Sequence, residues 1–234
     1  MKNSPQKMPK KGSAKHIARL LSSPENLKQI AKACNIEPRS MNVVVPRRDD
    51  CFRERGNAVV LQRLGLTKYT QQLKEFWPGR GHHWDGVVYG KDGDVDVVLL
   101  IEAKAHIGEM NSSPMNRKTT KTVNQRICAL KKVAQHFGAK FNEFWTGSKY
   151  QTANRLAFAY FLSGVAKKPA RVVYVLFTGD REIAHGKIAT KEMWEKKFNS
   201  AIENLGLPTD DSKCGRRVKS MLQCVIFPVE GLEQ

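Results

Sequence analysis

The stretch "DVDVVLLIEAKAH", residues 94 to 106, decides the fold of this chain. It contains an apolar run, Val97 to Ile101, which leads directly into Glu102, Ala103 and Lys104. Such a run is typical of a strand that is buried on both faces, and a strand of that kind normally excludes charge. Side chains alternate along a strand, so Glu102 and Lys104 project from one face and Ala103 from the other. The sequence thus predicts a buried strand that ends with an acid and a lysine side by side.

A second β-rich stretch, "HHWDGVVYG" (residues 82 to 90), precedes the first and is joined to it by "KDGD". Asp-Gly between two apolar runs is a strong signal for a β-hairpin. A two-residue turn at Asp92-Gly93 places Asp85 opposite Leu100 and diagonal to Glu102. A four-residue loop preserves this parity, whereas a three-residue loop moves Asp85 to the other face of the sheet. We therefore expect Asp85 to share a face with Glu102 and Lys104.

Helical patterns surround this hairpin. Residues 1–12 read as a flexible basic tail, 13–48 as an N-terminal helical extension, and 49–234 as one α/β domain. In the extension, Ser23 stands as an N-cap ahead of a proline in the second of two short helices. The remaining expected elements are helices at 49–66, 117–137, 150–162 and 190–206 and strands at 171–180 and 219–230. This order predicts a mixed β-sheet flanked by helices.

The charge of the chain favours a polyanionic partner. Of the 234 residues, 40 are Lys or Arg and 22 are Asp or Glu, which gives a formal net charge of +18. Such an excess of positive charge is common in proteins that bind nucleic acid, although a protein that is basic for solubility alone is a real alternative. The length and the 41% hydrophobic content suffice for one large domain or two small ones.

The cysteine pattern and the hydropathy argue against several classes of protein. Five cysteines are scattered without a CxxC pair, which argues against a disulfide framework and against a zinc knuckle. No apolar run approaches the roughly 20 residues that span a bilayer, and the N-terminus lacks the apolar segment of a secretory signal. We expect a cytoplasmic protein with reduced thiols and no membrane partner.

Two carboxylates that converge on one point call for a cation between them. Asp85 and Glu102 would repel each other, and a hard divalent ion such as Mg²⁺ or Mn²⁺ takes oxygen ligands of this kind. We expect Asp85 and Glu102 to hold the ion, with the Ala103 carbonyl as a third ligand. Lys104 would orient or deprotonate the attacking water and offset the charge of a phosphate. Glu54, on the helix expected at 49–66, is a candidate further ligand, and an exposed partner for a neighbouring arginine is the alternative.

The stretches "WDGVVYG" and "LLIEAKAH" together resemble the active-site signature of the PD-(D/E)xK phosphodiesterase superfamily, the restriction-endonuclease-like nucleases. Asp85 takes the place of the first acid and Glu102-Ala103-Lys104 that of the (D/E)xK triplet. Trp84 replaces the proline, which contributes no chemistry. The order of elements over about residues 49–178 is similar to the superfamily core, and stretches between 150 and 207 resemble a group of bacterial members of unassigned substrate. The resemblance implies a restriction-endonuclease-like α/β fold and a Mg²⁺-dependent nuclease.

Further residues are candidates for contact with the substrate. Members of the superfamily often carry a polar residue in the helix after the motif that helps to place the phosphate, and here Gln151, Asn154 and Arg155 occupy that helix. The helix expected at 117–137 contains no acid and places its lysines and arginines opposite its apolar arc. We therefore expect this face to follow a phosphate backbone, and a face that is simply solvated is the alternative. Its candidate contacts are Arg117, Lys118 and Lys121.

Three interpretations stay open at this point. The favoured one is a metal-dependent nuclease that hydrolyses phosphodiester bonds, with DNA preferred to RNA and a homodimer left open. The second is a catalytically inactive nucleic-acid-binding module of the same fold, and the third a hydrolase of a small phosphorylated metabolite. The triplet Glu102-Ala103-Lys104 also has a purely structural alternative: a Glu and a Lys on the same face of a strand usually form a surface salt bridge.

Overall fold

The computed structural model describes residues 8–47, 52–79, 81–115, 120–182 and 188–232. Its centre is a five-stranded sheet with the strand order β1-β4-β5-β6-β7. The first three strands in this order are antiparallel, and the last three are parallel. The strands are β1 (Asn42–Val45), β4 (Gly86–Asp92), β5 (Val95–Lys104), β6 (Ala170–Thr178) and β7 (Leu222–Pro228). The predicted mixed sheet is confirmed, and the restriction-endonuclease-like fold stays a prediction.

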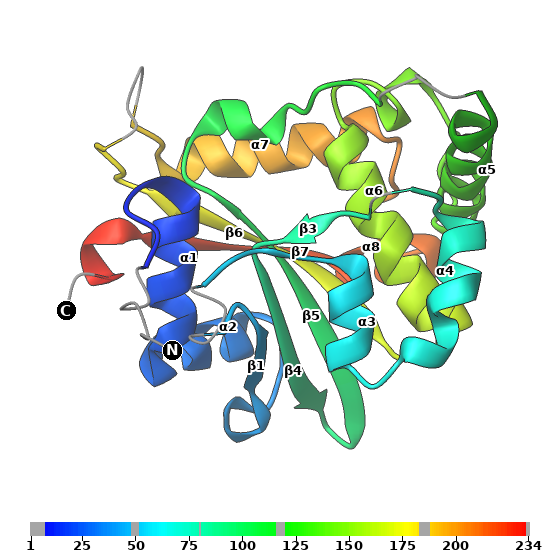
Figure 1. Cartoon of the computed structure of the whole chain (residues 1–234). Coiled ribbons are helices and arrows are strands. Elements are labelled where there is room, and N and C mark those ends of the chain that lie inside the picture. Colours follow the sequence, from blue (N-terminus) through cyan, green and yellow to red (C-terminus); the bar gives the residue numbers. More distant parts are fainter. Residues whose placement is uncertain (1–7, 48–51, 80, 116–119, 183–187, 233–234) are drawn as a thin grey trace.

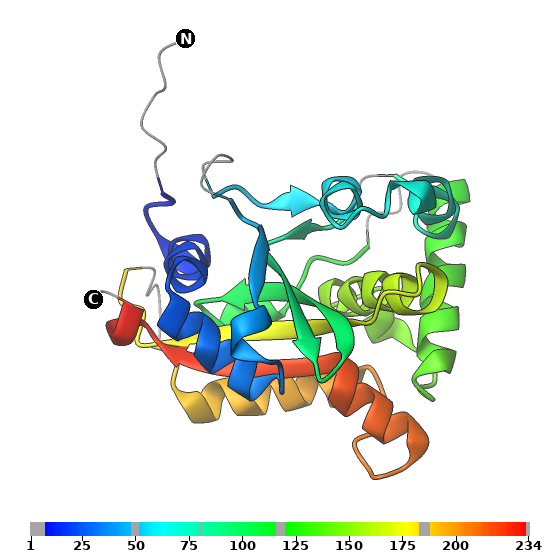
Figure 2. The same ribbon diagram turned by 90° about the horizontal axis from the view of Figure 1, so that it is seen from below.

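Helices cover both faces of this sheet (Figure 1 and Figure 2). On one face, apolar side chains of two helices pack with Leu99 and Ile101 of β5, and on the other face the remaining helices pack with Val98 and Leu100. The first two helices are α1 (Gly12–Ser22) and α2 (Pro24–Ala33). The others are α3 (Asn57–Arg63), α4 (Thr70–Phe76), α5 (Thr120–His136), α6 (Tyr150–Tyr160), α7 (Lys191–Asn204) and α8 (Lys213–Met221). Strand β5 is therefore buried on both faces, as its sequence predicts.

The turn of the β4–β5 hairpin differs from the predicted one. Asp92 pairs with Val95, so Gly93 and Asp94 form the turn in place of Asp92 and Gly93. Gly93 has a φ of 58°, a left-handed conformation that a glycine adopts without steric cost. Gly93 thus suits the first position of this tight turn, which lies one residue later than the prediction.

The corrected register preserves the predicted parity. Gly86 pairs with Ile101, and continuing this pairing by one residue places Asp85 opposite Glu102. The prediction that Asp85 lies opposite Leu100 was therefore wrong by two residues. Because a shift of two residues keeps every side chain on its original face, Asp85 still belongs to the face of Glu102.

The N-terminal region contributes to both the helical cover and the sheet. The Ser23 hydroxyl accepts a hydrogen bond from the backbone N–H of Asn26, which confirms the predicted N-cap of α2. Strand β1 falls inside the range predicted as a helical extension, yet it pairs with β4 at the edge of the central sheet. The described part of this range, residues 13–47, is thus built into the α/β fold.

One predicted helix begins much later than expected. Residues 49–51 of the predicted helix lie outside the described residues, 52–56 are not helical, and α3 begins at Asn57, preceded by Gly56 in an extended conformation. Glycine is unfavourable in a helix interior, whereas it is tolerated at an N-cap. The residues before α3 form a short strand, β2 (Arg55–Gly56), which pairs with β3 (His83–Trp84). Glu54 therefore precedes a strand and does not lie on a helix.

The C-terminal half follows the prediction with two differences. Helix α6 continues into a five-residue π-helix, Phe161–Val165, where the sequence predicts a single helix to Leu162. Helix α8 occupies the first part of the range predicted as the last strand, and β7 starts only at Leu222. Among the described residues, no helix is both long enough and apolar enough to cross a membrane.

Candidate active site

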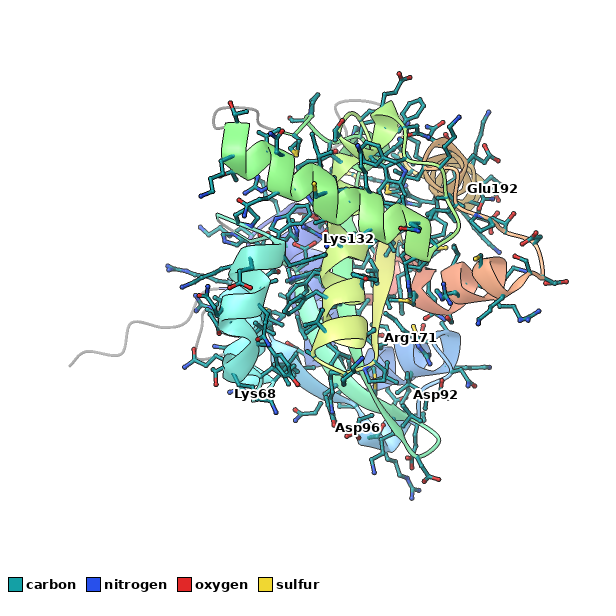
Figure 3. The ribbon with its side chains drawn as sticks, turned by 90° about the vertical axis from the view of Figure 1, so that its right-hand side faces the viewer. Lys68, Asp92, Asp96, Lys132, Arg171 and Glu192 are labelled. Carbon is teal, nitrogen blue, oxygen red and sulfur yellow. The ribbon has the colours of Figure 1, made fainter. Side chains whose placement is uncertain are left out.

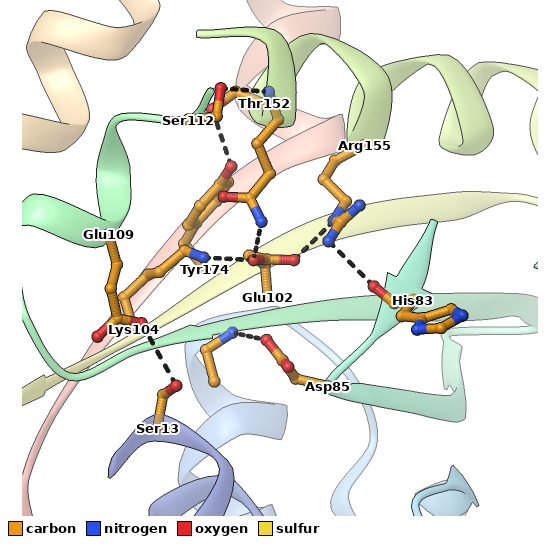
Figure 4. Close-up of polar contacts among 12 residues, drawn as sticks. Ser13, His83, Asp85, Glu102, Lys104, Glu109, Ser112, Thr152, Arg155 and Tyr174 are labelled. Atoms are coloured by element: carbon orange, nitrogen blue, oxygen red, sulfur yellow. Dashed lines mark hydrogen bonds and ion pairs between the residues drawn. The ribbon is translucent and has the colours of Figure 1, made fainter. Parts of the chain in front are cut away.

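Glu102 is the centre of a buried polar cluster at the carboxyl end of β5 (Figure 4). The residue is only 2% exposed. Its Oε1 accepts hydrogen bonds from Lys104 Nζ at 2.5 Å and Gln151 Nε2 at 2.8 Å, and its Oε2 accepts from Arg155 Nε at 2.6 Å. Both carboxylate oxygens therefore have strong donors, and these compensate for the loss of water around a buried charge.

Glu102 and Lys104 form a buried ion pair. Lys104 is 6% exposed, so the pair differs from the surface salt bridge that a Glu and a Lys on one strand face usually form. Burial by itself raises the pKa of Glu102, but the charges of Arg155 and Lys104 and their hydrogen bonds outweigh it and hold the pKa below its usual value. Glu102 is therefore ionised, and Lys104 is held on its face of the strand.

Asp85 lies beside Glu102, in the link between β3 and β4. Its Oδ2 accepts a hydrogen bond from the backbone N–H of Ala103 at 2.7 Å. Burial, and then the negative charges of Glu102 and Glu54, hold the pKa of Asp85 well above its usual value. The Ala103 N–H and the Lys104 charge act in the opposite direction and are outweighed. The predicted convergence of Asp85 and Glu102 is thus present, and the two cations of the site, Lys104 and Arg155, form their hydrogen bonds with Glu102 and not with Asp85.

Glu54 reaches the same site by an unpredicted route. Arg55 pairs with Trp84 in the antiparallel β2–β3 ladder. Glu54 precedes Arg55 and Asp85 follows Trp84. Glu54 and Asp85 consequently meet at the end of this ladder. The charge of Glu54 acts on Asp85. Glu54 is itself exposed, so its role as a metal ligand stays a prediction, and the helix expected to carry it is replaced by a strand.

Helix α6 supplies two of the partners of Glu102. Gln151 and Arg155 are four residues apart and so share one face of the helix. Arg155 Nη2 also donates to the backbone carbonyl of His83 at 3.0 Å, and its guanidinium lies 4.8 Å from the ring centroid of Trp84. Asn154 Oδ1 accepts a hydrogen bond from Arg155 Nη1 at 3.1 Å. The residues predicted to contact a substrate phosphate thus form a support for Glu102 in this structure.

The residue in the position of the motif proline has a structural role. Trp84 is fully buried, and its Nε1 donates a hydrogen bond to Asn57 Oδ1 at 2.8 Å. The ring lies under the Arg155 guanidinium, an arrangement that favours a cation over an aromatic face. Trp84 therefore ties α3 and α6 to the strand that carries Asp85, and its burial excludes stacking on a nucleobase.

The donor set fits a hard divalent ion that is bound partly through water. In the described part of the chain, no group of three or more His, Cys, Asp or Glu side chains is arranged to hold a metal by itself. Mg²⁺, however, is commonly held by one or two carboxylates, and water and substrate phosphates complete its shell. Asp85 and the Ala103 carbonyl, which points to the same strand edge as the Ala103 N–H, fit this role best. The oxygens of Glu102 already have donors, so Glu102 contributes chiefly its charge.

The predicted basic helix face is found in part. Arg117 and Lys118 lie outside the described residues. Lys121 is exposed in the first turn of α5, and Lys132 is exposed near its end. Figure 3 shows Lys132 and Lys68 on the side of the molecule covered by α4, α5 and α6. This side therefore presents several cations. Among the described residues, Lys121 forms no hydrogen bond with Glu102 or with the partners of Glu102.

The sequence-based predictions missed a pair of hydroxyl groups next to Glu102, those of Tyr174 and Thr152. Tyr174 of β6 pairs with Glu102 in the parallel ladder, and its hydroxyl group shares a hydrogen bond with Thr152 Oγ1 at 2.8 Å. Burial, and then the charge of Glu102, raise the pKa of Tyr174, which keeps this phenol neutral. A tyrosine inside the apolar run "RVVYVLFT" is the signal that marks this position, because a buried phenol needs a partner.

The candidate site therefore rests on Asp85, Glu102 and Lys104, with Glu54 at its edge and Gln151 and Arg155 behind Glu102. All of these residues occur in the sequence prediction, although several take different roles in the structure. Comparisons of the chain with models of known protein families, with curated proteins and with solved structures find no match.

Proposed function

We propose that the protein is a metal-dependent nuclease that hydrolyses phosphodiester bonds of nucleic acid, DNA in preference to RNA. The observation that carries this proposal is the placement of Asp85 beside Glu102, with Lys104 on the same face and no second cation for Asp85 in the hydrogen bonds of the site. Perturbed carboxylates beside a lysine are typical of sites that perform chemistry. The PD-(D/E)xK signature adds support from the sequence.

The proposed metal is Mg²⁺ or Mn²⁺, held by Asp85, the Ala103 carbonyl and the charge of Glu102, with Glu54 as a further ligand through water. When bound, such an ion lowers the pKa of a coordinated water and stabilises negative charge on phosphoryl oxygens. Asp85 accepts the ion in its ionised form, so binding requires the loss of the proton that its raised pKa favours.

The side chains around the proposed metal have distinct tasks. Lys104 offers donors on the face where a phosphate would approach, and its charge opposes the charge that develops in a phosphorane-like transition state. Glu102 fixes Lys104 through the 2.5 Å hydrogen bond and prevents the ammonium group from swinging away. Arg155 and Gln151 in turn fix Glu102. Residues that hydrogen-bond to the catalytic groups, and so fix their orientation, are common around metal sites.

The net charge of +18 supports nucleic acid as the substrate. A hydrolase of a small phosphorylated metabolite would need cations only around its pocket, whereas this chain exposes lysines on several elements. Salt separates the two, because affinity for a polyanion falls steeply with ionic strength and affinity for a small anion falls only weakly.

A cleavage panel tests the proposed function. Linear and circular DNA and structured RNA are incubated with the full chain in Mg²⁺, in Mn²⁺ and in EDTA. Cleavage that depends on the metal supports the proposal, and circular DNA separates an endonuclease from an exonuclease. Absence of cleavage in both metals, with binding retained, would favour the inactive binding module. One observation favours that second candidate: both oxygens of Glu102 are already occupied by protein donors.

Lys104→Ala separates the two candidates more sharply. If Lys104 acts on the water or the phosphate, its loss should reduce the cleavage rate by about a hundredfold or more and leave the affinity for nucleic acid largely unchanged. Lys32→Ala is the matched control, since Lys32 is exposed on α2 and has no place in the proposed site. If activity falls only in proportion to the folded fraction, Lys104 is a structural partner of Glu102 and the catalytic role is rejected.

A further inference from the structure

A buried lysine without a carboxylate partner lies at the N-terminal end of α6. Lys149 is 3% exposed, and its Nζ donates a hydrogen bond to the neutral Asn111 Oδ1 at 2.7 Å. Burial, and then the nearby charge of Lys197 on α7, hold the pKa of Lys149 below its usual value. Within the described ranges, neither lysine forms an ion pair with an acid.

The ammonium group of Lys149 is covered, but it lies directly against an exposed residue. Asn111 accepts its hydrogen bond and is itself exposed, so the buried cation lies just beneath the protein surface. Lys197 is half-buried and approaches from α7, which packs against the segment preceding Asn111. The two ammonium groups therefore face one small area between α6 and α7.

This area is directly connected to the candidate active site. Gln151 donates through Nε2 to Glu102 at 2.8 Å, and its backbone N–H donates to Ser112 Oγ at 3.0 Å. Ser112 follows Asn111, the partner of Lys149. Figure 4 shows Ser112 and Glu102 within the same group of polar contacts. A single residue thus spans the distance between Glu102 and the two-lysine area.

Two cations placed together without an anion are unfavourable. Each lysine loses part of its hydration, the like charges repel, and a neutral amide compensates for neither effect. A protein usually retains such an arrangement at a functional site, where a ligand supplies the missing charge. The missing partner here is an anion with several acceptor oxygens, because two ammonium groups offer many donors and no acceptor.

We propose that Lys149 and Lys197 bind a backbone phosphate of the nucleic acid that flanks the bond to be cleaved. The choice of a phosphodiester as the anion rests on the proposed function, whereas the anion site itself does not. Ser112 and the amide of Asn111 offer further hydrogen bonds to the same group. A phosphate held here and a phosphate at Lys104 would belong to one strand and fix its direction across the site.

The test measures binding without cleavage. Affinity of the full chain for a short DNA labelled with a fluorophore is measured by anisotropy in EDTA over a range of salt concentrations. Lys197→Ala should weaken binding by about fivefold to tenfold at low salt and lower the salt slope by about one unit, the effect of one lost phosphate contact. Lys196→Ala, the exposed neighbour on α7, is the matched control and should stay within about twofold of the wild type.

Lys149→Met separates a ligand site from a structural role. If the lysine is retained for the ligand, the variant should bind DNA more weakly and yet unfold at the same or a higher temperature than the wild type, because an unpaired charge has been replaced by an apolar group of similar length. A lower unfolding temperature with unchanged affinity per folded molecule would overturn the proposal.

Failure of the proposed function and failure of this site give different results. If the wild type binds no nucleic acid, inorganic phosphate is added and thermal unfolding is followed instead. A rise of the unfolding temperature in the wild type that is absent in Lys197→Ala retains the anion site and rejects the nucleic-acid substrate. If phosphate stabilises neither protein, or both equally, the site is rejected.

Discussion

Arg155→Met removes the partner that most strongly controls Glu102. Arg155 is 7% exposed, and its guanidinium bonds to Glu102, to the carbonyl of His83 and to Asn154. Methionine is similar in length and retains the packing against Trp84, so the substitution removes the charge and the donors with little change in volume. The variant therefore isolates the electrostatic role of Arg155.

The expected loss of stability follows from the burial of Glu102. Removing one member of a buried ion pair typically costs about 3–5 kcal/mol, because the remaining charge is left without compensation. Lys104 stays beside Glu102 and limits the loss, while the missing hydrogen bond to His83 adds about 1 kcal/mol. We expect a decrease of about 4 kcal/mol in the free energy of unfolding, or roughly 8–16 °C in the unfolding temperature.

The double variant Arg155→Met/Glu102→Gln provides the decisive comparison. Glu102→Gln alone leaves Arg155 and Lys104 as buried cations without their acid. In the double variant Lys104 still has Asp85, whose charge interacts with it. The double variant should therefore be more stable than the sum of the single effects predicts, by about 2 kcal/mol or more, which is within the range of coupled neighbours.

The assay is denaturant unfolding of the four proteins at several pH values. The pKa of Glu102 is depressed in the folded state, so its ionisation stabilises the wild type above the pKa of the unfolded chain, and this contribution is lost as the pH falls through the lower folded pKa. The difference between wild type and Arg155→Met should thus be largest near neutral pH and shrink in acid. Additive effects at neutral pH, or a difference independent of pH, would refute the view that Arg155 acts through the charge of Glu102.

Three further predictions concern Asp85, Lys121 and Asp180. Asp85→Asn should abolish Mn²⁺ binding measured by titration, and an unchanged Mn²⁺ affinity would contradict the assignment of Asp85 as a ligand. The same substitution should raise the unfolding temperature in EDTA at neutral pH by a few degrees, because it removes an acid whose pKa is raised by burial and by Glu102. Lys121→Glu should weaken binding to DNA of any sequence and flatten its salt dependence, and an unaltered salt slope would remove α5 from the substrate surface. Asp180→Ala should lower the free energy of unfolding by about 1–3 kcal/mol, because His16 Nε2 and Asp180 Oδ2 form a buried hydrogen bond of 2.9 Å between α1 and the end of β6. Asp180→Asn keeps an oxygen that can accept a hydrogen bond and should lose less; equal losses would exclude this hydrogen bond as the cause.

Local patterns that repeat along the sequence predicted the elements well. The apolar run of β5 and the alternation of Glu102 and Lys104 were sufficient to predict a buried strand with both charges on one face. The Ser-Pro pair at residues 23–24 predicted the start of α2, and the four-residue spacing of Gln151 and Arg155 predicted their common face. Each of these inferences depends on strand or helix geometry alone.

Local patterns failed where a distant segment changes the outcome. The turn lies at Gly93-Asp94, one residue later than the local Asp-Gly pair predicts, and the pairing of the whole β4–β5 ladder has this register. The residues around Glu54 became a strand because β3 offers a partner for β2, and helix propensity cannot anticipate a strand partner that lies so far along the chain.

The sequence by itself determined which residues carry charge into the sheet and on which face they lie, since the period of a strand is a property of the backbone. Only the tertiary structure decided what those charges do. Arg155 and Gln151 face Glu102 because α6 packs over β5 and β6, and that placement turns expected phosphate contacts into supports for a carboxylate. Lys149 became a buried cation only because α7 and the segment after β5 close over it. The energy of a buried charge depends on all the groups around it, and these come together only in the folded chain.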